Sequence, residues 1–88
     1  MTEQKILDKF NAMAVEAIKI IDSGEEIGEG FLIGDMAATL SYGVAEAAAI
    51  IAQNHPQYAH LCFTEGKRTV KRITDHAAHN SAKQKGLA

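Results

Sequence analysis

The longest apolar segment of the chain runs from Met36 to Gln53, and Glu46 is its one charged residue. Read at 3.6 residues per turn, the polar positions of this segment and of the residue before it fall on one narrow stripe. The stripe consists of Asp35, Thr39, Tyr42, Glu46 and Gln53. A helix that is apolar around the rest of its circumference has to be buried against several neighbours. In a chain of 88 residues such neighbours are few, so the pattern predicts that a second copy of the protein supplies some of them.

The residues before this segment predict another amphipathic helix. Thr2 can cap its N-terminus, and Glu3 suits the positive end of the helix dipole. Ser23 and Gly24 are expected to end it, because glycine readily takes the left-handed conformation that follows a helix. Its apolar face repeats at heptad spacing: Leu7, Phe10, Ala14, Ala17 and Ile21.

The segment from Glu25 to Gly34 is rich in glycine, which argues against a regular helix and predicts a loop. Phe31, Leu32 and Ile33 are too apolar for a free linker, so we expect them to fold back on the rest of the protein. Asp35 is expected to cap the apolar helix that follows.

A tight turn is predicted at Pro56, since proline fits the first turn of a helix. The apolar positions after it allow one long helix that ends near Ser81. Such a helix would be about 39 Å long, against about 28 Å for the Met36–Gln53 helix, at 1.5 Å per residue. This overhang favours a kink or break near Gly66, with Thr64 as the candidate cap of a separate helix.

Together these patterns predict an all-α fold. We expect a small helical bundle of three helices, or three and a short fourth, joined by a glycine-rich loop and a proline turn. The length fits one domain over residues 1–82 with a flexible tail at 83–88. Only 6% of the residues are aromatic. A core built largely of alanine buries little area per residue, so self-association would add needed stability.

The first functional hypothesis is therefore a small non-enzymatic, homo-oligomeric protein-interaction module of the adaptor, inhibitor or regulatory-subunit type. We expect a dimer or higher oligomer, and a further protein partner steered by the acidic N-terminal half. The residues expected in the oligomer interface or in the core are Met36, Leu40, Gly43, Val44, Ala47, Ile50 and Ile51.

The charges divide the chain into two unlike parts. Residues 1–57 carry nine acidic residues against three lysines, whereas residues 58–88 carry six basic residues against two acidic ones. Basic side chains at helical spacing can neutralise phosphates, so the alternative is a nucleic-acid-binding protein or a binder of a small, anionic, nucleotide-like ligand. A solvated face that balances the acidic half is the simpler interpretation, since the overall pI is near 6.0. The candidate residues are Lys67, Arg68, Lys71, Arg72 and His79.

No motif indicates catalysis, a metal or another cofactor. His76 and His79 lie one helical turn apart, but two histidines make an incomplete metal site, and no motif supplies the remaining ligands. Cys62 lies in an apolar run, and His60 would point to a different side of a helix. We therefore expect a core thiol and no enzyme.

Glu46 has two interpretations, an exposed edge of the polar stripe or a buried partner for a basic residue of another helix or subunit. A membrane span is not expected, because Glu46 would lie near the middle of the bilayer at a cost of about 2.5 kcal/mol. The first residues lack a basic and long apolar leader, so the expected location is the cytoplasm.

Overall fold

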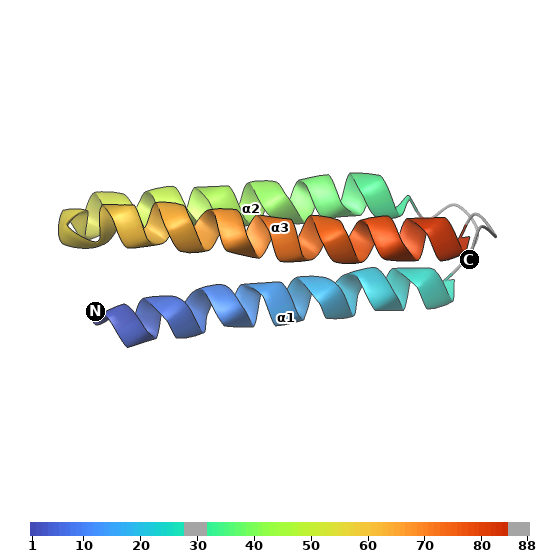
Figure 1. The fold of residues 1–88 in the computed structure, drawn as a ribbon, viewed down its shortest axis with the longest axis horizontal. Helices are drawn as coiled ribbons and strands as arrows, with labels where there is room; N and C mark the ends of the chain where they lie inside the picture. The colour runs from blue at the N-terminus through green and yellow to red at the C-terminus, as the bar shows by residue number, and fades with distance from the viewer. Residues whose placement is uncertain (28–31, 85–88) are drawn as a thin grey trace.

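The computed structural model describes residues 1–27 and 32–84, which form a bundle of three helices (Figure 1). The elements are α1 (Glu3–Ile27), α2 (Ile33–Asn54), the 3-10 turn η1 (Pro56–Tyr58) and α3 (Ala59–Gln84). The helices run side by side and alternate in direction, so the molecule is a rod of 46 × 18 × 15 Å. The all-α prediction is confirmed, and the described residues contain neither a strand nor a fourth α-helix.

The core lies along the line where the three helices meet. The predicted heptad face of α1 is turned inward: Phe10, Ala14, Ala17 and Ile21 are buried, and Leu7 is half-buried. Complete burial of a large apolar side chain contributes about 1.5–3 kcal/mol, so this row explains why α1 is held against the other two helices. The largest fully buried side chains come from all three helices and are Phe10, Ile6, Ile21, Ile33, Ile73 and Cys62.

The prediction that Ser23 and Gly24 end the first helix is wrong, because α1 continues to Ile27. A glycine inside a helix costs about 1 kcal/mol relative to alanine. Gly24 is buried, however, and packing of this part of α1 against the bundle outweighs that local preference. The predicted glycine-rich loop is shortened accordingly, and its residues 28–31 lie outside the described part of the chain.

The predicted cap of the apolar helix at Asp35 is also wrong. The N-cap position is Leu32, which is extended and makes no side-chain capping hydrogen bond. Asp35 lies in the first turn of α2, where a carboxylate favours the positive end of the helix dipole. Ile33 is buried as expected, whereas Leu32 is 64% exposed, and Phe31 falls outside the described residues.

The favoured break at Gly66 does not occur, since α3 is one helix of 26 residues and Thr64 lies inside it. The length argument fails because α1 and α2 have 25 and 22 residues and so match α3 better than predicted. Gly66 faces α2: a Cβ built on it would lie 3.4 Å from the Cβ of Ala48. The glycine therefore allows α3 to pack closely on α2. At its end α3 includes Lys83 and Gln84 of the predicted tail, and residues 85–88 are outside the described range.

Candidate functional site

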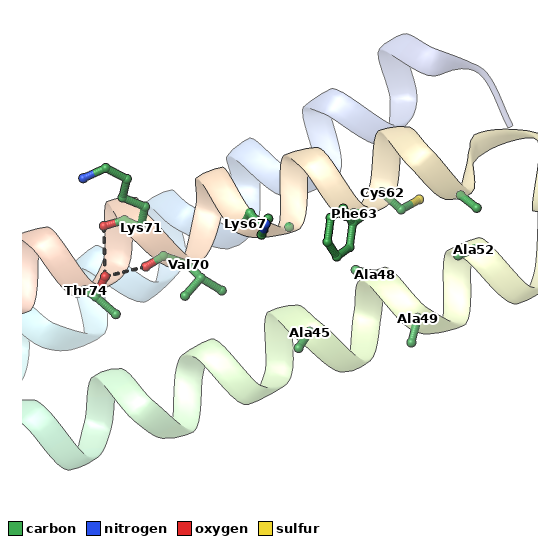
Figure 2. A pocket seen from close by; sticks show the side chains of 12 residues that line it. Ala45, Ala48, Ala49, Ala52, Cys62, Phe63, Lys67, Val70, Lys71 and Thr74 are labelled. Carbon is green, nitrogen blue, oxygen red and sulfur yellow. Dashed lines mark hydrogen bonds between the residues drawn. The ribbon is translucent and has the colours of Figure 1, made fainter.

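A groove of about 640 Å³ runs between α2 and α3 (Figure 2). In this view α1 lies behind α3, so the groove opens on the side of the hairpin that α1 does not cover. The α2 wall is made only of alanine side chains, which are Ala45, Ala48, Ala49 and Ala52. Their spacing of three or four residues places them on one face of the helix, and that face differs from the one that carries the buried Val44 and Ile51.

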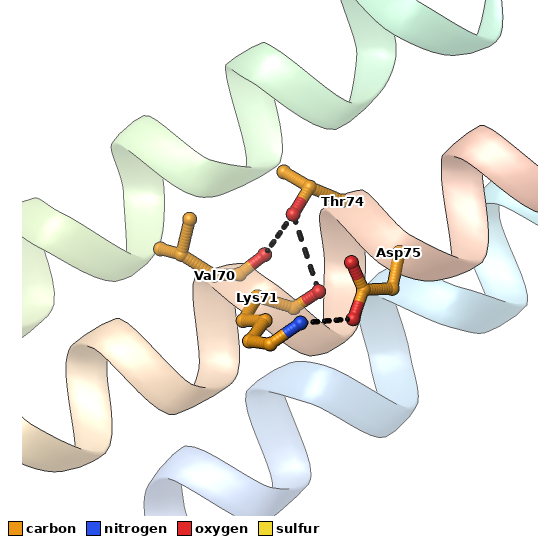
Figure 3. Close-up of polar contacts among 4 residues, drawn as sticks. All are labelled: Val70, Lys71, Thr74 and Asp75. Carbon is orange, nitrogen blue, oxygen red and sulfur yellow. Dashed lines mark hydrogen bonds and ion pairs between the residues drawn. The ribbon is translucent and has the colours of Figure 1, made fainter.

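The α3 wall of the groove carries larger side chains than the α2 wall, and one of them is aromatic. Phe63 is 61% exposed, and the ammonium group of Lys67 lies 4.7 Å from the centre of its ring. The half-buried Val70 and the exposed Thr74 continue the wall along α3. Thr74 donates its hydroxyl hydrogen bond back to the carbonyls of Val70 and Lys71, at 3.0 and 3.2 Å (Figure 3). Its polar atom is therefore satisfied within α3, and the groove stays apolar along its length.

Charged residues lie on both sides of the groove. Lys67 and Lys71 flank it on α3, and Lys71 forms an exposed ion pair of 2.7 Å with Asp75 (Figure 3). On α2, Glu46 follows Ala45 and is exposed. Within the single chain Glu46 is therefore an exposed edge of the polar stripe and not a buried partner of a basic residue. Among the described residues, neither Glu46 nor Lys67 forms an ion pair.

The structure places most of the predicted interface-or-core residues of α2 inside the chain's own core. Val44 and Ile51 are buried, and Met36 and Leu40 are partly buried and pack on that core. Ala47 is half-buried, whereas Gly43 and Ile50 are exposed outside the groove. The exposed apolar residues that face the groove, Ala45, Ala49 and Phe63, were not predicted. The regular spacing of the alanines was the one signal that could have indicated them.

The predicted basic residues do not form one row. Lys67 and Lys71 lie at the groove, whereas Arg68 pairs with Glu65 of its own helix at 3.1 Å. Arg72 donates a hydrogen bond of 3.0 Å to Asn11 of α1, on another side of the helix. His79 is exposed. Nucleic-acid or anion binding by this set stays a prediction, and local carboxylates already neutralise two of its members.

His76 is turned toward α1 and away from His79. Its Nε2 lies 2.7 Å from Oδ1 of Asp22, and the buried Asn80 donates a hydrogen bond of 2.9 Å to the same oxygen. This cluster ties the C-terminal half of α1 to α3. Over residues 1–27 and 32–84, no three His, Cys, Asp or Glu side chains come close enough to hold a metal ion.

Cys62 is a fully buried thiol at the base of the groove, as its apolar surroundings predicted. Burial raises its pKa because the charged thiolate loses solvation. His60 is exposed on another side of α3. A nucleophilic cysteine reacts as the thiolate, which burial disfavours here.

Comparisons with protein-family models, with curated proteins and with solved structures found no match. In the part of the chain that the structure describes, none of the helices combines the length and the apolar character that crossing a bilayer requires.

Proposed function

We propose that this protein is a small non-enzymatic interaction module that self-associates through the open face of α2 and α3. The observation that supports the proposal is the apolar groove, with its exposed alanines on α2 and the exposed Phe63 on α3. Water at such a surface is released when another apolar helical surface covers it, which favours association. The surface has the form of the grooves that accept helices in other protein complexes.

The open face is large enough for a specific dimer. The 22 residues of α2 give it a length of about 33 Å at 1.5 Å per residue, and two adjacent helices are about 20 Å wide. The face therefore presents roughly 650 Å², close to the ~800 Å² that each partner contributes to a standard interface. The alanine side chains also let a second helical layer approach closely.

Sedimentation over a range from low to high micromolar protein tests the proposal. We expect a concentration-dependent species of twice the 9.5 kDa chain mass. Ala45→Glu, which places a carboxylate in the groove, should shift the protein to the monomer, because burying an unpaired charge opposes association. The matched control is Ala12→Glu, the same change at an exposed alanine of α1. A wild-type protein that stays monomeric at high micromolar concentration contradicts the proposal, and equal effects of the two variants would exclude the groove as the interface.

A further inference from the structure

We propose that the two copies pair about a two-fold axis parallel to the helices, so that α2 of each copy packs on α3 of the other. This inference rests on the proposed self-association and adds its orientation. The groove of one copy is then covered by the α2–α3 hairpin of a second copy. The two hairpins pack face to face as a four-helix bundle, and α1 of each copy lies on the outside.

The charged residues of the two rims lie at one level of the bundle. Gly66 faces Ala48, and α2 and α3 run in opposite directions. Glu46 precedes Ala48 by two residues, so it is level with position 68 of α3. At 1.5 Å per residue, this level is about 1.5 Å from that of Lys67 and about 4.5 Å from that of Lys71 along the axis.

A two-fold axis parallel to the helices leaves every residue at its own level. It places α2 of one copy over α3 of the other, so the rim with Glu46 meets the rim with Lys67 and Lys71 of the second copy. A two-fold axis perpendicular to the helices instead places α2 over α2 and α3 over α3. Glu46 then faces α2 of the second copy instead of a lysine, and the α3 rims with Lys67 and Lys71 meet each other.

The charges favour the parallel axis. Like charges across an interface oppose binding, whereas opposite charges fix its orientation. Within the described residues of one chain, Glu46 and Lys67 have no ion-pair partner, so each is available to a second copy. The parallel axis supplies an ion-pair partner to both.

The same orientation gives Phe63 a place to pack. Phe63 lies three residues before Gly66, at the level of position 51 of α2, and its ring is exposed. The partner's α2 then presents Ala49 and Ala52 to this ring. Small side chains leave room for an aromatic ring, so each Phe63 fills the alanine wall of the other copy.

Charge reversal distinguishes the two orientations by the dissociation constant measured by sedimentation. With the parallel axis, Glu46→Lys faces the lysine rim and should weaken the dimer about tenfold. Adding Lys67→Glu and Lys71→Glu to it should restore most of the affinity. With the perpendicular axis, Glu46 lies against α2 of the second copy and away from Lys67 and Lys71, so neither change is expected. The matched control is Glu16→Lys on the exposed side of α1, which should leave the dissociation constant unchanged.

Thiol cross-linking gives an independent result. Single variants Glu46→Cys and Lys71→Cys are mixed, equilibrated and treated with a short bismaleimide, while the buried Cys62 serves as an internal unreactive thiol. The parallel axis predicts a linked heterodimer of the two variants and little linkage in Glu46→Cys alone. Efficient linkage of Glu46→Cys to itself overturns the proposed orientation but leaves self-association intact. A wild-type protein without dimers overturns both.

Discussion

The amide nitrogen of Asn80 on α3 lies 2.9 Å from a carboxylate oxygen of Asp22 on α1, and the two residues are 58 positions apart in the sequence. Asn80 is only 3% exposed, so its amide group depends on partners within the protein, which are Asp22 and, at 3.1 Å, Nε2 of His76. His76 shares the same oxygen. Together these polar contacts fix the C-terminal half of α1 against α3.

Asn80→Ala should therefore destabilise the protein. Loss of the hydrogen bond, with Asp22 still half exposed to water, is expected to lower the free energy of unfolding by about 1–2 kcal/mol. For a domain of this size each kcal/mol corresponds to about 4–8 °C in Tm, which calorimetry resolves. His79→Ala, at an exposed neighbour on the same helix, is the control and should stay within about 0.5 kcal/mol of wild type. Equal stabilities of the two variants would contradict a structural role for the Asp22 contact.

Glycines 43 and 66 are expected to respond differently to enlargement. A Cβ on the exposed Gly43 meets nothing within 4 Å, so Gly43→Ala should raise the free energy of unfolding by up to about 1 kcal/mol through helix propensity. At Gly66 a Cβ only just fits against Ala48, so Gly66→Ala should gain less. Gly66→Leu should lose stability by about 1–3 kcal/mol, because it forces α3 away from α2. Urea titrations of the three variants measure these differences, and a stable Gly66→Leu protein would contradict close packing at this point.

Phe63→Ala separates association from folding. The ring is 61% exposed in the single chain, so its removal should change the unfolding free energy of the monomer by less than about 1 kcal/mol. In the proposed dimer the ring is covered, and truncation of a buried interface aromatic should raise the dissociation constant about tenfold or more. Val15→Ala, at a 40% exposed apolar residue of α1, is the control and should leave the dissociation constant unchanged. If Phe63→Ala associates as tightly as wild type, Phe63 lies outside the interface.

Cys62 should react with thiol reagents only after the protein opens. Its side chain is fully buried and its pKa is raised by burial, so the reactive thiolate is both inaccessible and disfavoured. Because the folded-state pKa is above the unfolded one, this thiol contributes stability at neutral pH that is lost as the pH rises past the ordinary cysteine pKa. Labelling with a chromogenic disulfide should be slow in native buffer and fast in guanidinium. Rapid labelling of the native protein would contradict the burial of this side chain.

Features that depend on periodicity could be predicted from the sequence. Helix ends and breaks were predicted wrongly where packing against another helix overrides the local preference of a residue. Phe10 and Ile21 could be assigned to the core because heptad spacing fixes their side of the helix. Gly24 and Gly66 were interpreted as breaks because glycine disfavours helix locally, yet both are buried within continuous helices. Which contacts a glycine permits depends on a second helix, and the local sequence does not contain that information.

The groove could not be predicted for a related reason. Alanine is tolerated in a core and on a surface alike, so the spacing of Ala45 and Ala49 shows a shared face without showing what covers it. The larger residues of α2 were predicted as one group, interface or core, whereas Val44 and Ile51 lie in the core and Ile50 is exposed outside the groove. Only the position of α1, which covers one side of the α2–α3 hairpin, distinguishes the closed face from the open one.

The tight connection at η1 bears on the order in which the protein folds. Pro56 joins α2 directly to α3, so contacts such as that between Ala48 and Gly66 close a short loop and carry a small entropic cost. Contacts of α1 with α3, such as that between Asp22 and Asn80, close a much longer one. We expect a transition state built on the α2–α3 hairpin, with α1 docking afterwards. Destabilising changes along the hairpin contact should then slow folding, whereas those on α1 should mainly accelerate unfolding.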